Sequence, residues 1–162
     1  MNVREREPGL DGWVTEALDL AERNVAAGGG PFGALVVCAG RSVATGINRV
    51  TPDLDPTAHA EVPAIRAACR ALSRFTLAGC TLVTSCEPCP MCLTSALWAR
   101  LDAIVYAADR DDAAHAGFDD RAFYDLLGRP PSAWPLSVER LAAADRLRPF
   151  ESWLAKPDRV AY

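Results

Sequence analysis

Apolar and polar positions repeat with two different periods along the chain, and segments of each kind follow one another. Residues 11–28 carry apolar side chains at helical spacing, and the triple glycine at 28–30 ends this pattern. Two short apolar runs, 34–38 and 42–47, flank a turn at 39–41 and predict a β-hairpin. The polar, proline-rich segment 48–57 then predicts a loop.

The remaining pattern continues the alternation of helices and strands. We expect a helix over 58–72, a strand over 80–85, a helix from Pro90 to about residue 100, a strand over 102–108, a helix over 121–127, a short strand within 135–140, and a helix over 147–155 that Pro157 ends. Strands that alternate with helices are typical of layered α/β domains. The pattern therefore predicts one α/β domain that spans residues 1–162.

Composition narrows the classes of partner. The net charge is −4 and the chain contains a single lysine, Lys156, whereas nucleic-acid binding relies on many basic contacts to phosphate. A small-molecule substrate is therefore favoured over a nucleic acid. No apolar run approaches the ~20 residues of a membrane span, and the charged N-terminus lacks the apolar core of a signal peptide. We expect no membrane partner and a cytoplasmic location.

Six cysteines raise the question of disulfides or metal. In a reducing cytosol, clustered cysteines indicate metal or catalytic use more than disulfides. Cys38, Cys69 and Cys80 stand in apolar segments and are expected to be buried apolar fillers. The other three cysteines form the cluster SCEPCPMC at 85–92.

Three side chains at two predicted helix starts suit a metal ion. Cys89 and Cys92 lie three apart on one helical face, where Pro90 presets the first turn. A helix start favours the thiolate form that zinc needs. His59 is the third candidate ligand, and three ligands with an open fourth position describe a catalytic Zn²⁺. Glu61, two residues from His59, is placed to carry protons.

Cys86 leaves an alternative open. It lies on the extended segment before the helix, and we interpret it as a neighbour of the site. A closed structural zinc site of His59, Cys86, Cys89 and Cys92 remains the non-enzymatic alternative.

The pattern H-x-E…P-C-x-x-C is a signature of zinc-dependent nucleobase deaminases. With it come the stretches GGPFGA (29–34), DPTAHAEVPAIR (55–66), TSCEPCPMC (84–92), WAR (98–100), YAA (106–108) and AGFDD (116–120). In these stretches the chain resembles the cytidine deaminase superfamily, and within it the bacterial guanine deaminase branch. The resemblance implies a three-layer α/β/α fold with a mixed five-stranded sheet. It also implies zinc ligands at His59, Cys89 and Cys92 and a proton shuttle at Glu61.

The resemblance also implies a set of residues around the substrate. Its second acidic residue corresponds to Asp120, and a carboxylate suits the N1–H and C2 amino donors of guanine. The remaining implied substrate contacts are Asn48, the aromatic residues Phe32 and Trp98, the backbone N–H of Ala60, and Tyr162 at the C-terminus. In this branch the C-terminal segment, about 147–162 here, crosses to another subunit, which implies a domain-swapped homodimer.

These observations together predict hydrolysis of guanine to xanthine and ammonia. Within the same chemistry, the alternative is a deaminase of another base or nucleoside, such as cytosine, guanosine or an aminotriazine. A tRNA adenosine deaminase is a further alternative, because DPTAHAE is shared with that group. The acidic net charge disfavours that alternative.

Overall fold

Four strands form one mixed sheet in the computed structural model, which describes residues 3 and 9–161. The strands are β1 (Gly33–Cys38), β2 (Arg41–Ile47), β3 (Cys80–Cys86) and β4 (Ala103–Ala108), in the spatial order β2-β1-β3-β4. Strand β1 is antiparallel to both of its neighbours, and β3 is parallel to β4. The two central strands are almost wholly buried, as expected for strands that are covered on both faces.

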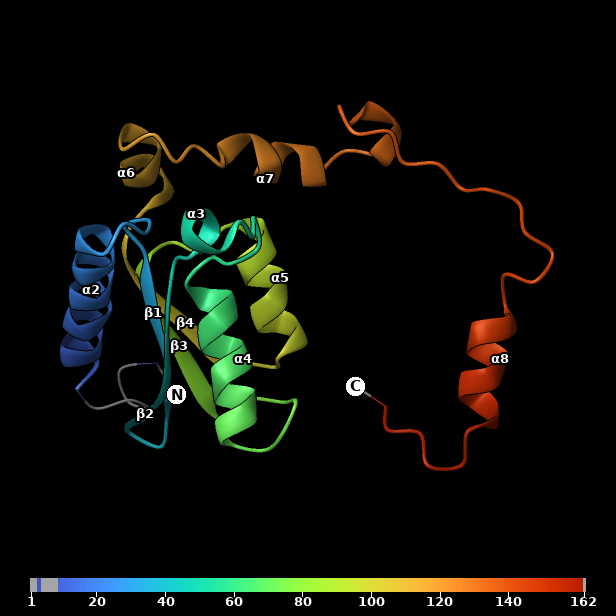
Figure 1. The fold of residues 1–162 in the computed structure, drawn as a ribbon, viewed down its shortest axis with the longest axis horizontal. Helices are drawn as coiled ribbons and strands as arrows, with labels where there is room; N and C mark the ends of the chain where they lie inside the picture. Colours follow the sequence, from blue (N-terminus) through green and yellow to red (C-terminus); the bar gives the residue numbers. More distant parts are fainter. Residues whose placement is uncertain (1–2, 4–8, 162) are drawn as a thin grey trace. The chain divides into compact units, whose positions relative to one another are not determined.

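Helices cover both faces of this sheet (Figure 1). Helix α2 (Leu10–Ala26) lies on one face, and helices α4 (Glu61–Ala71) and α5 (Pro90–Trp98) lie on the other. Each face has its own apolar core. Leu35 and Val83 pack toward α2, whereas Val36 and Leu82 pack toward α4 and α5. The opposite faces follow from the period of two along each strand, and the result is the predicted α/β/α layering.

Two glycines allow the helices to approach the sheet closely. A Cβ atom on Gly33 would lie 2.5 Å from the carbonyl oxygen of Ala17 in α2. A Cβ atom on Gly46 would lie 2.1 Å from the carbonyl oxygen of Ala60, just before α4. Both distances are far below van der Waals contact, so any larger residue would push the helix away. Gly46 thereby holds the start of α4 against the end of β2.

The expected fifth strand is absent from the part of the chain that the structure describes. Residues 135–140 form no strand, and Leu136 and Val138 are exposed. The alternation there is short, and a strand also needs a neighbour to accept its backbone hydrogen bonds. The expectation of five strands is corrected to four for the described chain.

Two short helices lie in segments where no helix was predicted. They are α3 (Val50–Asp53) and α6 (Arg110–His115), and a single 3₁₀ turn covers Pro131–Ala133. Asp109 caps α6 by accepting hydrogen bonds from the backbone N–H groups of Asp111 and Asp112. The expected helices near the C-terminus are confirmed as α7 (Arg121–Leu127) and α8 (Arg148–Ala155).

The chain divides into two units, residues 1–124 and residues 125–162. The first contains the sheet and the helices on its two faces. In the second, α8 exposes the large apolar side chains Phe150, Trp153 and Leu154. The expectation of one domain over the whole chain stays a prediction. No helix in the described part of the chain combines the length and the apolar character that crossing a bilayer requires.

Candidate active site

Neighbouring element ends bring the candidate residues together. His59 immediately precedes Ala60 and α4, while Cys89 is the N-cap residue of α5 and Cys92 lies in its first turn. Pro90 occupies the first helical position, where its missing N–H is not needed. Helices α4 and α5 lie on the same face of the sheet, so their starts face each other.

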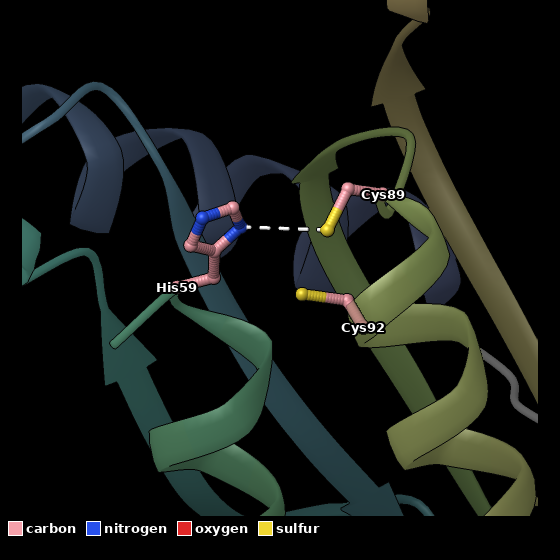
Figure 2. Close-up of side chains that lie close together, drawn as sticks. All are labelled: His59, Cys89 and Cys92. Carbon is pink, nitrogen blue, oxygen red and sulfur yellow. Dashed lines mark hydrogen bonds between the residues drawn. The ribbon is translucent and has the colours of Figure 1, made fainter. Parts of the chain in front are cut away.

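His59, Cys89 and Cys92 form a tight cluster (Figure 2). Their candidate ligand atoms all lie within 4.8 Å of one another, and Nδ1 of His59 is 3.5 Å from Sγ of Cys89. Bond lengths of about 2.3 Å for Zn–S and about 2.1 Å for Zn–N place tetrahedral ligand atoms roughly 3.6–3.8 Å apart. Two sulfurs and one imidazole nitrogen at this spacing fit zinc. The predicted ligands are therefore brought together as expected.

Hydrogen bonds within the cluster shift the pKa values of the two thiols in opposite directions. The contact with Cys92, followed by that with His59, lowers the pKa of Cys89 to about 4. The same contact with Cys89 raises the pKa of Cys92, and the contact with the Cys89 sulfur raises the pKa of His59. Cys89 is thus already a thiolate at neutral pH, which is the form that zinc binds.

Glu61 is an almost fully buried carboxyl group at the start of α4. It is 6% exposed, and burial raises its pKa above the ordinary value. Its side chain lines the same cavity as His59 and Cys89. A carboxyl group with a raised pKa beside the candidate metal ligands is suited to take up and release a proton.

The two aspartates of AGFDD have separate environments. Asp119 is exposed and forms an ion pair with Arg121, at 2.7 Å between Oδ2 and Nη2. Both aspartates border the cavity, but only Asp120 has an Oδ1 atom that is buried without a hydrogen-bond partner among the described residues. Burial, then the nearby Cys89, raises the pKa of Asp120. A buried oxygen without a partner is costly, so Asp120 is the one that is open to a ligand donor.

Asn48 follows β2 and is buried at the cavity wall. Its side-chain oxygen accepts a hydrogen bond from the backbone N–H of Val50 at 3.3 Å. Gly30 lies so close that a Cβ atom there would be 2.8 Å from this oxygen. The amide of Asn48 is therefore held between α3 and the glycine-rich loop.

Asn24 of α2 is a residue that the sequence analysis missed. It is 3% exposed, and its side-chain nitrogen donates to the carbonyl oxygens of Gly30 at 2.8 Å and Asn48 at 2.7 Å. It thereby ties two cavity-lining segments together. A signal was present: Asn24 continues the buried helical stripe of Ala17 and Ala21, where a polar residue needs a buried partner.

Two aromatic rings line the cavity, which has a volume of about 790 Å³. Phe32 packs edge-on against Phe118, with ring centroids 5.0 Å apart and an interplanar angle of 86°. Phe32 was predicted as a site residue, and Phe118 was overlooked within AGFDD. The volume lies within the range of small-molecule sites.

An ion pair braces the loop that carries Cys89. Both carboxylate oxygens of Glu87 accept hydrogen bonds from Arg110, whose backbone N–H also donates to Oε2 at 3.1 Å. The guanidinium carbon of Arg110 lies 3.8 Å from the ring centroid of Tyr124, and the Tyr124 hydroxyl donates to the Pro88 carbonyl at 2.9 Å. Arg110 lowers the pKa of Glu87. The carboxylate of Glu87 is thus engaged by Arg110 and has a structural role.

Four of the remaining residues have less direct placements. Cys86 lines the cavity, but the cluster of candidate ligands within the described chain does not include it. Burial, then Glu61, raises the pKa of Cys86 to about 11, and its thiol donates to the Asp109 carbonyl at 3.6 Å.

Ala60 is fully buried between His59 and Glu61. Trp98 is 65% exposed and is not part of the cavity lining. Tyr162 lies outside the described residues.

Known proteins share both the sequence and the fold. The family model of the cytidine and deoxycytidylate deaminase zinc-binding region matches residues 10–108 of the sequence. Guanine deaminase of Bacillus subtilis (strain 168) is 47% identical over 142 residues, 87% of this chain and 91% of that protein.

Solved structures extend the likeness to three dimensions. The X-ray structure of Bacillus subtilis guanine deaminase matches with a TM-score of 0.91 and 44% identity, covering 94% of this chain and 98% of that one. A structure solved in complex with 8-azaguanine matches with a TM-score of 0.66 and 39% identity, covering 68% and 65%. The chain belongs to the zinc-binding cytidine and deoxycytidylate deaminase family.

Proposed function

We propose that this protein is a zinc-dependent guanine deaminase that converts guanine and water to xanthine and ammonia. One observation carries the proposal: His59 and Cys89, which cluster with Cys92 as candidate metal ligands, line a single cavity together with two carboxyl groups of raised pKa, Glu61 and Asp120. The relative that is 47% identical carries the name guanine deaminase, and a structural relative binds the guanine analogue 8-azaguanine.

We assign the metal to His59, Cys89 and Cys92. Zinc at an open three-ligand site lowers the pKa of a bound water toward ~7 and so supplies a nucleophile at neutral pH. Glu61 accepts the proton of the attacking water and returns it to the substrate, since its carboxyl group lines the cavity beside His59 and burial raises its pKa. Replacement of the C2 amino group by oxygen then releases ammonia.

Substrate selection falls to Asp120 and Asn48. The unpartnered Oδ1 of Asp120 suits the donors at N1 and C2 of guanine, and it can also help protonate the departing amine. The amide of Asn48 offers a donor and an acceptor to the purine edge. Phe32 flanks the base, and the backbone N–H of Ala60 and the ring of Trp98 remain proposed contacts.

We also propose that the protein is a homodimer in which segment 147–162 docks on the second copy. Phe150, Trp153 and Leu154 of α8 are 65%, 40% and 64% exposed, and contiguous exposed apolar side chains mark interaction surfaces. Tyr162 would then close the active site of the partner and exclude water from it. A cytoplasmic location is part of the same proposal.

The direct test offers the zinc-loaded protein a panel of guanine, guanosine, cytosine, adenine and an aminotriazine, with release of ammonia as the measurement. The proposal expects guanine to have the highest kcat/KM by at least ~100-fold, the scale of sites that reject a base lacking matched polar groups. Faster turnover of another base or nucleoside would assign the same chemistry to that substrate. If no compound of the panel released ammonia, the proposal that the protein is a deaminase would be refuted.

A further inference from the structure

Two cysteines outside the active site face each other across the sheet. Cys38 ends β1 and Cys80 begins β3, and the two are directly opposite in the antiparallel pairing of these strands. Both are free thiols. Both belong to the apolar layer between the sheet and α4, so their side chains lie on the same face. The sequence predicted three buried fillers, but only Cys80 is buried, whereas Cys38 and Cys69 are partly buried.

Backbone hydrogen bonds show which kind of cross-strand pair this is. The N–H of Cys80 donates to the carbonyl of Leu77 at 3.0 Å, and its carbonyl accepts from the N–H of Asp102 at 3.1 Å. The backbone N–H and carbonyl of Cys80 thus form hydrogen bonds with Leu77 and Asp102 and not with Cys38. Cys38 and Cys80 are a non-hydrogen-bonded pair, in which Cα atoms approach to about 4.5 Å and side chains are closest. That separation lies inside the window for a disulfide.

One guanidinium contacts both sulfurs. Nη2 of Arg74 lies 3.3 Å from Sγ of Cys80 and 4.0 Å from Sγ of Cys38. Arg74 takes part in none of the ion pairs of the described residues. Its Nε atom is buried and has no hydrogen-bond partner among those residues. A positive charge beside a thiol favours the thiolate and its reactivity. Arg74 is therefore placed to assist thiolate chemistry at this pair.

The two thiols differ in their access to solvent. Cys80 is fully buried, and burial, then the contact with Cys38, raises its pKa to about 11. Cys38 is partly exposed at the end of its strand. A reagent in solution therefore meets Cys38 first, and Cys80 is held next to it as a second thiol.

We propose that Cys38 and Cys80 form a redox modification site that closes to a cross-strand disulfide when the protein meets an oxidised low-molecular-weight thiol such as glutathione disulfide. The Cys38 thiolate attacks one sulfur of the reagent, which releases one glutathione thiolate and leaves a mixed disulfide on Cys38. The Cys80 thiol then attacks the Cys38 sulfur, loses its proton, and releases the second glutathione. Two protein thiols are oxidised and one reagent disulfide is reduced to two thiols.

The bond has a physical consequence for the fold. It closes the loop of residues 38–80, which contains β2 and α4 with His59 and Glu61. A loop of this length restricts the unfolded chain strongly. We expect oxidation to raise Tm by at least ~5 °C, and a reductant to reverse that gain. Zinc content and turnover are expected to stay the same, because neither cysteine touches the cavity.

The test incubates the zinc-loaded protein in glutathione buffers of increasing oxidised fraction and maps disulfides by peptide mass spectrometry. The expected result is a Cys38–Cys80 linked peptide that is lost in Cys38→Ser and in Cys80→Ala, while Cys69→Ser retains it. Arg74→Ala is expected to slow the closure by about three- to tenfold, and Arg74→Lys to restore most of the rate.

Two results would overturn the proposal. One is a stable mixed disulfide with glutathione on Cys38 while Cys80 remains a free thiol. The other is oxidation of Cys89 or Cys92 with loss of zinc before any Cys38–Cys80 link appears. Zinc content and circular dichroism of each variant establish that it is folded, so that loss of the link reports on the missing thiol.

Discussion

At the scale of single residues, neighbours with the same chemistry have different environments. Asp119 and Asp120 are adjacent aspartates, but Asp119 forms an exposed ion pair with Arg121, whereas one oxygen of Asp120 is buried without a partner among the described residues. Cys86 and Cys89 belong to one motif, but burial keeps Cys86 protonated to about pH 11 while its neighbours make Cys89 acidic. The residue type indicates which side chains are candidates for the site, and their burial and neighbours determine which of them can act in it.

Glu61→Gln removes the proposed proton shuttle with almost no change in shape. We expect kcat to fall by at least ~100-fold, the usual scale for a general acid–base group. Zinc content is expected to stay at the level of the unmodified protein, because Glu61 is not a ligand. Steady-state kinetics and metal analysis provide the measurements, with Glu22→Gln on exposed α2 surface as the control. Unchanged turnover in Glu61→Gln would contradict the shuttle.

Asp120→Asn and Asp119→Asn form a matched pair. Loss of a hydrogen bond to a charged group costs about 1.5–3 kcal/mol, so we expect kcat/KM for guanine to fall by ~10- to 100-fold in Asp120→Asn. Asp119→Asn is expected to change it by less than about threefold, because exposed ion pairs contribute little. Similar losses in both variants, or equal losses on every base tested, would give Asp120 a structural role.

At the scale of elements, polar side chains brace the cavity wall by joining segments that are distant in sequence. Asn24 joins α2 to the glycine-rich loop and to Asn48. Glu87, Arg110 and Tyr124 join the loop before α5 to α6 and α7. Each brace crosses between segments that are distant in sequence, so the site depends on correct packing of several elements at once.

Asn24→Ala removes the donor to the buried carbonyl oxygen of Asn48 and one of the two donors to the carbonyl oxygen of Gly30, which also accepts from the N–H of Phe32. We expect KM for guanine to rise about tenfold or more while kcat changes less, because Asn48 loses its support but the metal cluster does not. The lost pairing is also expected to cost about 1–3 kcal/mol of stability. Kinetics and thermal unfolding measure the two effects, and the exposed neighbour Arg23→Ala is the control. A fall confined to kcat would argue against the positioning role.

Glu87→Gln tests the second brace through its pH dependence. Arg110 lowers the pKa of Glu87 in the folded state, so the carboxylate stabilises the fold above its unfolded pKa of about 4.3. That stability is lost as pH falls through the lower folded pKa. We expect the Tm of Glu87→Gln to lie below that of the unmodified protein at neutral pH.

Below about pH 4 the two Tm values are expected to converge. Scanning calorimetry across pH gives the comparison, and loss of zinc in acid affects both proteins alike. A Tm difference that is independent of pH would mean that charge is not the source of the stabilisation.

At the scale of the whole molecule, the described residues 125–161 carry many exposed large apolar side chains and contribute none to the two buried apolar clusters. The exposed face of α8 is the clearest case. A second copy is the occupant that we propose, and the proposal makes activity a property of the pair. The C-terminal residues from one chain would complete the cavity of the other.

Mixing two inactive proteins tests this arrangement. A chain that lacks residues 147–162 has intact catalytic side chains, whereas Glu61→Gln has an intact C-terminal segment. If each segment serves the partner, mixed dimers contain one complete site, and co-refolding is expected to restore up to about a quarter of normal activity. Each protein refolded alone provides the control. No recovery, although light scattering shows mixed dimers, would refute the swap.

Much of the architecture and the metal cluster could be predicted from local sequence. The 3.6-residue and two-residue periods indicated the helices and strands that flank the site, and the short-range spacing of Cys89 and Cys92 indicated two ligands. The prediction of a fifth strand within 135–140 was wrong for the described chain, because a strand depends on a neighbour that local pattern does not specify.

The sequence alone determined which residue types lie on which helix start, and hence that His59, Cys89 and Cys92 suit zinc. Only the tertiary structure showed that Asp120 has a buried oxygen without a partner among the described residues while Asp119 pairs with Arg121. It also showed that Asn24 supports Asn48, that Glu87 is held by Arg110, and that Cys38 faces Cys80. The reason is range. Backbone periodicity acts over a few residues, whereas burial, charge pairing and strand register depend on segments that only packing brings together.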